Sequence, residues 1–152
     1  MILKKATTDD IKIVQSIINK FAAKNLLLPR SLSELYDHVR NFILALDEKN
    51  NKIVGACSLK VCWEDLAEVC SLAVEDQYQR QGYGKALLER CIEDGIQLGI
   101  KRVFALTYSQ DFFLNLSFKV IDKSELPHKI WNDCLKCPKF PECDEIAMIR
   151  YL

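Results

Sequence analysis

The sequence lacks an excess of charge of either sign: Lys and Arg number 21, Asp and Glu number 21, and the formal net charge is zero. A protein that binds nucleic acid or an anionic membrane through a broad electrostatic field carries surplus positive charge. The sequence also lacks an apolar run near the roughly 20 residues that span a bilayer, and residues 1–8 are no targeting signal. We therefore expect a cytoplasmic protein with no nucleic-acid or membrane partner.

Internal repeats and low-complexity segments are absent, and the hydrophobic and charged fractions, 49% and 28%, are close to those of globular proteins. These features exclude a disordered chain, a collagen-like chain and a coiled-coil array. A length of 152 residues is typical of one domain. We therefore expect residues 1–152 to fold as a single domain.

The cysteines do not indicate a disulfide scaffold. There are seven, and four lie in apolar periodic segments where a thiol serves as a small core residue, namely Cys57, Cys62, Cys70 and Cys91. Cys134, Cys137 and Cys143 follow His128 in an irregular stretch. Cys-x-x-Cys places two thiolates at chelating distance for zinc, but a matching second pair is missing. Zinc, a reversible disulfide and reduced thiols remain alternatives, of which we expect reduced thiols and no metal.

Apolar residues recur at three- and four-residue intervals in three segments, the second of them short, which predicts three helices. The first begins at Thr8, and the second begins at Ser31 with Glu34 at the capping-box position. The third ends at Gly99, where a left-handed cap belongs. Its predicted inward residues are Leu87, Leu88, Cys91, Ile92 and Ile96.

Strand-like segments separate these helices, and three of them follow one another as an antiparallel meander. The expected strands are residues 1–6, 42–47, 52–62, 66–74, 102–107, 118–121 and 145–151, with a brief helix at 111–116. The predicted order is βααβββαβαββ, which places the chain in the α/β (α+β) class.

A glycine-containing loop joins the third strand of the meander to the third helix. Its residues are Gln79, Arg80, Gln81, Gly82, Tyr83, Gly84 and Lys85. Glycines allow several backbone N–H groups to point at one site, and the helix N-terminus adds about half a positive charge. Such a loop suits a diphosphate. A helix start that merely requires small residues fits the same spacing, so the loop alone leaves both interpretations open.

The strand Ala67–Val74, the pattern Gln/Arg-x-x-Gly-x-Gly/Ala and the amphipathic helix together resemble the acetyl-CoA motif of the GNAT superfamily of N-acetyltransferases. The predicted order of elements is similar to that fold along nearly the whole chain. The resemblance implies a mixed, mostly antiparallel central sheet flanked by helices, with acetyl-CoA as the acyl-donor cosubstrate. A Rossmann site would need its glycines after the first strand of a parallel βαβ unit.

The resemblance also implies roles for the strand and the loop. The backbone N–H groups of Gln79–Gly84 would hold the diphosphate of coenzyme A, with Lys85 as a weaker member. The N–H of Leu72 would point at the thioester carbonyl, and the backbone at Ala73 and Val74 would pair with the pantetheine arm. A fixed donor at the developing oxyanion lowers the barrier by about 3 kcal/mol in comparable sites.

Glu68 is the predicted general base, because an ammonium group must lose a proton before its nitrogen attacks. We expect it to share strand parity with Cys70 and Leu72, beside the reacting carbonyl. It matches a position where several GNAT members place their base. An exposed Glu at the start of a strand is the alternative.

The general acid departs from the GNAT pattern, which often places a Tyr in Phe/Tyr-x-x-x-Gly-Phe. Phe113 stands where the hydroxyl would be, and Ser117 replaces the glycine. Because a thiol of pKa about 8.5 leaves readily as thiolate, a dedicated acid is not required. Tyr108 is a second candidate, with core packing as its alternative role.

Two further segments, Leu26–Arg40 and Leu126–Met148, resemble the short N-acetylglutamate synthases of bacterial arginine biosynthesis. This resemblance implies an α-amino acid acceptor, L-glutamate first and glutamine second. Arg30 and Lys129 are the predicted partners of its carboxylates, and solvated surface charge is the alternative for each. A peptide, polyamine or other small-molecule acceptor, a non-catalytic domain that binds coenzyme A, and a homodimer all remain open.

Overall fold

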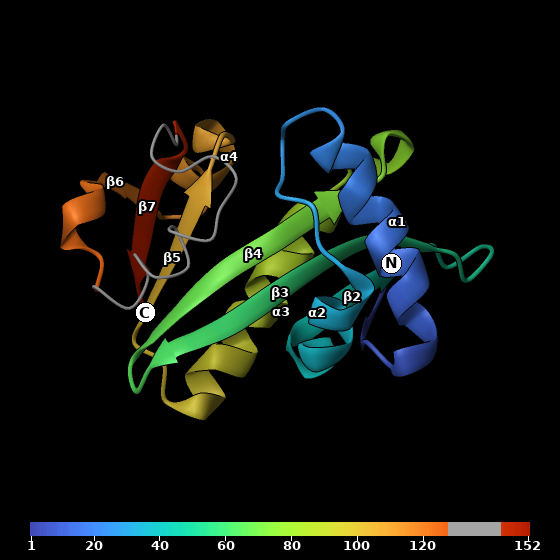
Figure 1. Ribbon diagram of the computed structural model, residues 1–152, viewed down its shortest axis with the longest axis horizontal. Coiled ribbons are helices and arrows are strands. Elements are labelled where there is room, and N and C mark those ends of the chain that lie inside the picture. The colour runs from blue at the N-terminus through green and yellow to red at the C-terminus, as the bar shows by residue number, and fades with distance from the viewer. Residues whose placement is uncertain (128–143) are drawn as a thin grey trace.

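The computed structural model describes residues 1–127 and 144–152, and these form seven strands and four α-helices (Figure 1). Their bounds are β1 Ile2–Lys5, α1 Ile11–Ala22, α2 Leu32–Asp37, β2 Phe42–Leu46, β3 Ile53–Trp63, β4 Leu66–Val74, α3 Tyr83–Leu98, β5 Arg102–Thr107, α4 Gln110–Leu114, β6 Lys119–Ile121 and β7 Ile146–Tyr151. This order confirms the predicted βααβββαβαββ arrangement. No helix in this part of the chain is long and apolar enough to cross a membrane.

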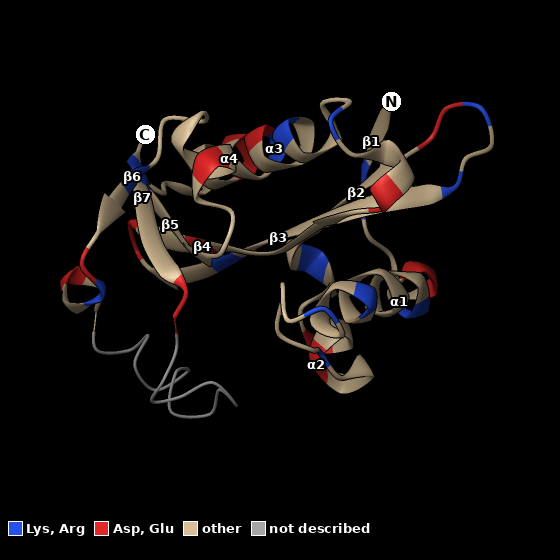
Figure 2. Cartoon of the chain, turned by 90° about the horizontal axis from the view of Figure 1, so that it is seen from above, with Lys and Arg blue, Asp and Glu red and all other residues tan. Residues whose placement is uncertain are grey.

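The strands form one mixed sheet in the order β1-β2-β3-β4-β5-β7-β6. Every neighbouring pair is antiparallel except β4 and β5, which are parallel. Helices α3 and α4 cover one face, and α1 and α2 cover the other, as the view from above shows (Figure 2). The expected mostly antiparallel sheet with helices on both sides is therefore confirmed.

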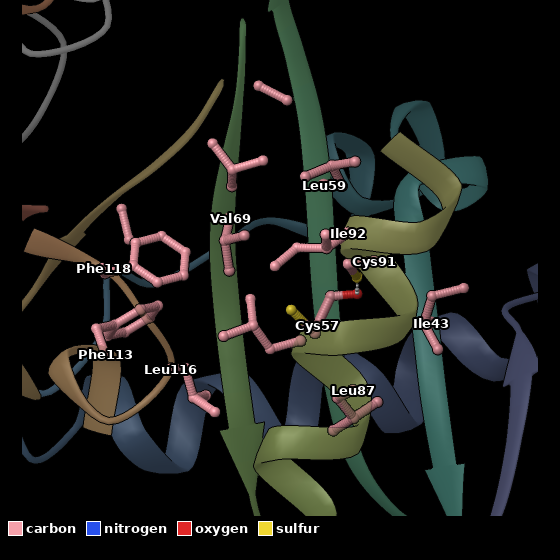
Figure 3. Packing of buried hydrophobic residues seen from close by; sticks show 14 of the residues in the cluster. Ile43, Cys57, Leu59, Val69, Leu87, Cys91, Ile92, Phe113, Leu116 and Phe118 are labelled. Carbon is pink, nitrogen blue, oxygen red and sulfur yellow. Dashed lines mark hydrogen bonds between the residues drawn. The ribbon is translucent and has the colours of Figure 1, made fainter. Parts of the chain in front are cut away.

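Each face of the sheet has its own hydrophobic cluster. Under α3 the cluster includes Leu87, Leu88, Cys91 and Ile92, packed against side chains of β2, β3 and β4 (Figure 3). Under α1 the cluster is built from Ile11, Val14, Ile17 and Ile18, the apolar stripe of that helix. Burial of these stripes is the main force that holds the helices against the sheet.

The end of α3 confirms one prediction and corrects another. Gly99 adopts a left-handed conformation with φ of 96°, and the amide of Ile100 donates to the carbonyl of Gly95 at 2.9 Å, as in a Schellman cap. Ile96 was expected to lie inward but is 55% exposed. Gly95 takes the inward position of the last turn, so Ile96 is rotated by about 100° away from the sheet.

The predicted helix starts and core cysteines are confirmed in part. Ser31 caps α2, and its hydroxyl accepts from the amide of Glu34 at 3.2 Å, as predicted. The first helix is capped by Thr7 rather than Thr8, because Asp10 reaches back to the amide of Thr7. Cys57, Cys62 and Cys91 are buried and unbridged, which confirms them as core residues, and Cys70 is half-buried.

Candidate active site

Strand β4 has two unlike halves. Residues 66–68 pair with β3 on one side and with β5 on the other. Beyond Glu68 no pairing with β5 continues among the described residues, and the two strands diverge (Figure 1). A cavity of about 480 Å³ lies along this opening, lined by β4 from Val69 to Val74 and by β5 from Ala105 to Thr107. A parallel pair that separates in this way leaves a row of backbone groups without a strand partner.

A β-bulge interrupts the second half of β4. Ser71 has φ of 55°, and the register with β3 shifts between the pairs Ser58↔Cys70 and Ala56↔Ala73. Before the bulge the odd-numbered residue Val69 faces α3, and after the bulge the even-numbered residue Leu72 faces α3. The bulge therefore reverses the alternation of side chains along β4. The prediction that Glu68, Cys70 and Leu72 share one face is wrong for Leu72, because the bulge reverses the alternation.

The bulge leaves the amides of Leu72 and Val74 directed at the cavity. The amide of Glu75 donates to the carbonyl of Val54 on β3 at 2.8 Å. Backbone groups alternate along a strand, so the amides of Val74 and Leu72 point away from β3 and toward the opening. The Val74 carbonyl accepts a hydrogen bond from Nε2 of Gln79 at 2.9 Å. At Val74 the amide, rather than the carbonyl, is the group left for a ligand.

The predicted diphosphate loop lies at one end of the cavity. Arg80 and Gly82 are left-handed, with φ of 62° and 89°, and α3 begins directly after them. The amides of residues 80–85 donate no hydrogen bond to other described groups of the chain. Arg80, Gly82, Gly84 and Lys85 all line the cavity. The loop thus offers unpaired N–H groups, a helix N-terminus and two cations at one place.

The other three loop residues use their side chains to hold the loop. Gln79 bonds to the end of β4, and Nε2 of Gln81 donates to the carbonyl of Gln77 at 3.0 Å. The Tyr83 ring is buried and meets the ring of Tyr78 edge-on. The amide of Gln79 donates to the carbonyl of Asp76 at 3.3 Å, so the prediction that this amide is free for a diphosphate is wrong. Of these three residues, Gln81 and Tyr83 have amides that donate to no other described group.

Glu68 and Cys70 lie on the opposite face of β4, the face that α1 and α2 cover. Glu68 is half-buried. In the sheet it pairs with Lys60 of β3 on one side and with Phe104 of β5 on the other. Cys70, two residues farther along the same face, lines the cavity. Burial raises the pKa of the Cys70 thiol to about 12, and the negative charge of Glu68 acts in the same direction. The thiol is therefore neutral at physiological pH.

Arg30 reaches this face from the connection between α1 and α2. Its carbonyl accepts from Nε2 of Gln15 at 3.1 Å, and its guanidinium pairs with Glu34 at 3.4 Å. Its positive charge opposes the rise in the pKa of the Cys70 thiol. Cys70 lines the cavity, whereas Arg30 and Glu68 are not among the described residues that line it.

Several predicted residues lie outside the part of the chain that the structure describes. They are His128, Lys129, Cys134, Cys137 and Cys143. The described residues contain no group of three or more side chains suited to hold a metal ion.

The residues considered for the general acid lie in or beside the short helix α4. Phe113 is buried and lines the cavity, with its ring edge-on to Phe112 and Phe118. Ser117 takes φ of 70°, the conformation that favours the glycine of the GNAT pattern. The hydroxyl of Tyr108 donates to Oδ1 of Asp144 at 2.6 Å.

Sequence reasoning missed two features of the cavity. The bulge at Ser71 carries no glycine, so no residue signal marked it. Phe21, Leu26 and Leu27 close one side of the cavity from the end of α1 and the connection that follows. Leu26 and Leu27 lie in the segment Leu26–Arg40 that resembles the N-acetylglutamate synthases, whereas no signal in the sequence marked Phe21.

A protein-family model described as the acetyltransferase (GNAT) family matches residues 15–118. The chain belongs to this family. A relative from Chlorobaculum tepidum, an uncharacterised N-acetyltransferase, is 33% identical over 150 residues, which cover 99% of this chain and 96% of the relative. The GNAT protein is thus an acyltransferase that uses acetyl-CoA.

Two further likenesses concern amino-acid acetylation. An amino-acid acetyltransferase of Mycobacterium tuberculosis is 29% identical over 133 residues, which cover 87% of this chain and 76% of the relative. The N-acetylglutamate synthase of Neisseria gonorrhoeae, solved with coenzyme A and N-acetyl-glutamate, has a TM-score of 0.90 at 27% identity. That comparison covers 99% of this chain and 35% of the longer structure.

Proposed function

We propose that this GNAT enzyme transfers the acetyl group of acetyl-CoA to the α-amino group of L-glutamate, the first step of arginine biosynthesis. The observation that carries the proposal is the cavity beside the open half of β4. It joins the predicted diphosphate loop at one end to Cys70, which lies on the opposite face of the sheet on the strand that also carries Glu68. The amino-acid acetyltransferases among its relatives support an amino-acid acceptor.

The donor would be held by the main chain. The unpaired amides of residues 80–85 would bind the diphosphate, and the amide of Val74 would pair with a pantetheine carbonyl in the manner of an added strand. The amide of Leu72 would then donate to the thioester oxygen. Since that oxygen gains charge when nitrogen attacks, the donor stabilises the transition state more than the bound substrate.

The acceptor would approach from the face that α1 and α2 cover. Glu68, directly or through a water that it holds, would take a proton from the ammonium group. The nitrogen lone pair then attacks the carbonyl carbon, and the carbon–sulfur bond breaks as coenzyme A leaves as thiolate. The second proton of the new amide nitrogen passes to this thiolate, directly or through water, so the products are the neutral amide and the thiol of coenzyme A. Cys70 lies between Glu68 and Leu72 along β4. Its thiol is neutral and adds no charge that would repel either substrate.

Arg30 would bind a carboxylate of the acceptor. Its guanidinium presents several N–H donors in a fixed fork, and Gln15 fixes the backbone beside it. Lys129, proposed as the second cation, lies outside the described residues. A dicarboxylate with an α-amino group suits two cations beside one base.

The test is release of free coenzyme A by purified protein across a panel of amino acids, with a polyamine and a short peptide as further acceptors. We expect kcat/KM for L-glutamate to exceed that for glutamine at least tenfold. A preference for glutamine would correct the acceptor, whereas turnover only with the peptide or polyamine would overturn the amino-acid assignment.

A further inference from the structure

A hydrogen bond outside the cavity connects the predicted diphosphate loop to a distant turn. Tyr78 ends the 3-10 turn Asp76–Tyr78, directly before the loop, and its hydroxyl donates to Oδ2 of Asp47 at 2.9 Å. Asp47 follows β2 in the connection to β3, 31 residues earlier in the chain. Neither residue is among those that line the cavity within the described part of the chain.

The Asp47 carboxylate is itself held in place. Its Oδ1 accepts from the amide of Lys49 at 2.9 Å, and the backbone of Asp47 bonds to Lys52 and Asn51. The Lys49 amide and the Tyr78 hydroxyl keep the pKa of Asp47 below its ordinary value, so it is charged at neutral pH. The same bond raises the pKa of Tyr78, which remains a donor. A charged acceptor makes this one of the stronger kinds of hydrogen bond.

The aromatic ring of Tyr78 extends this connection to the far side of the loop. It lies edge-on to the ring of Tyr83, with centroids 5.7 Å apart and planes at 82°. Tyr83 is the first residue of α3, so the contact bridges the two ends of the loop. Between them Arg80 holds a left-handed conformation with φ of 62°, which strains a residue with a side chain. Such a conformation persists only where its surroundings enforce it.

We propose that Asp47 and Tyr78 are positioning residues that fix the loop amides in their binding arrangement before acetyl-CoA arrives. A loop already ordered loses less entropy when it binds a diphosphate, so the bond acts on donor affinity rather than on the acetyl transfer itself. This inference rests on the proposed role of residues 79–84 in binding that diphosphate.

The central experiment compares two acyl donors in wild type and Tyr78→Phe, which removes the hydroxyl and keeps the ring. One donor is acetyl-CoA, and the other is S-acetyl-N-acetylcysteamine, which carries the thioester but no diphosphate. We expect Kd and KM for acetyl-CoA to rise about five- to tenfold. The ratio of kcat/KM for acetyl-CoA to that for the truncated donor should fall by a similar factor.

Two further variants separate this bond from a general loss of packing. Asp47→Ala should reproduce the effect of Tyr78→Phe, while Asp47→Asn, whose side-chain oxygen still accepts, should restore most of the affinity. Tyr151→Phe removes the hydroxyl of an exposed tyrosine on β7 and serves as the matched control.

Wild-type affinity of Tyr78→Phe for acetyl-CoA would overturn this inference, as would an equal loss for both donors. The proposed donor site has its own test, because Gly82→Trp must lose acetyl-CoA if the loop binds it. If Gly82→Trp loses binding and Tyr78→Phe does not, only the positioning role fails. If both bind normally, the site itself is wrong.

Discussion

The proposed donor side and the proposed acceptor side are built from different parts of the protein. The proposed donor side consists of backbone amides from one continuous stretch, from the bulge in β4 to the first turn of α3. The proposed acceptor side consists of side chains from separate elements, with Glu68 and Cys70 on β4 and Arg30 before α2. The first depends on the shape of the main chain, and the second depends on which side chains meet.

This difference has a consequence for how each side tolerates substitution. A site made of amides is insensitive to most side-chain changes but is blocked when the loop gains bulk or changes conformation. A site made of charged side chains is sensitive to single replacements, because each group supplies a separate interaction. Substitutions on the two sides should therefore differ in which substrate they affect.

Gly82→Trp should abolish acetyl-CoA binding, because φ of 89° disfavours any side chain there and the indole would lie in the predicted diphosphate site. Isothermal titration calorimetry measures the affinity. Gly99→Trp is the matched control: Gly99 is also left-handed, with φ of 96° and open space around it, but ends α3 at its far end. Equal affinities of the two variants for acetyl-CoA would show that the loop at Gly82 does not bind the diphosphate.

Glu68→Gln should lower kcat about 100-fold or more, the usual contribution of a general base, and change the affinity for acetyl-CoA less than twofold. Steady-state kinetics with the preferred amino acid and direct titration of acetyl-CoA supply the two values. Glu64→Gln, the same change in the exposed turn between β3 and β4, is the control. A kcat close to that of wild type would remove Glu68 as the base.

Arg30→Ala should raise KM for the amino acid about tenfold, because one charge-assisted hydrogen bond to a carboxylate is lost. KM for acetyl-CoA should stay within twofold of wild type, since the donor side is built from amides. Arg40→Ala removes an exposed arginine and serves for comparison. A similar rise in KM for both substrates would show that the two sides are not separate.

The pH dependence of the free energy of unfolding tests whether the Cys70 thiol is shielded from water. Its folded pKa of about 12 lies above the value near 9 in the unfolded chain, so its contribution to stability is complete below pH 9 and is lost as pH rises toward 12. Between pH 8 and pH 10 the free energy of unfolding of wild type should therefore fall more than that of Cys70→Ala, by about 1.4 kcal/mol. Denaturant titrations measure both; identical falls would place the thiol in water.

Ser117→Gly should stabilise the protein by about 0.5–1 kcal/mol, because glycine adopts φ of 70° without steric cost. Thermal and urea unfolding detect the change, and kcat should be unaffected since Ser117 is exposed at the end of α4. Ser117→Ala, which keeps the β-carbon, should give no such gain. Stabilisation by both replacements would contradict the backbone explanation.

The difference between the two sides also explains which features could be predicted from the sequence. The proposed donor side could be predicted because the strand, the loop with Gly82 and Gly84, and the amphipathic helix together resemble the acetyl-CoA motif, although the glycine spacing alone left two interpretations open. The neutrality of the Cys70 thiol depends on what packs against β4, which no local pattern records. The bulge at Ser71 escaped prediction because it is set by pairing with β3, and the alternation from Glu68 to Leu72 failed for that reason.

A crystal structure with acetyl-CoA bound would show which backbone amides hold the donor. We predict the diphosphate within hydrogen-bonding distance, about 3 Å, of the amides of residues 80–85, with the thioester oxygen at the amide of Leu72. A donor bound elsewhere, or a thioester oxygen directed away from β4 with the Leu72 amide bonded inside the protein, would contradict the account.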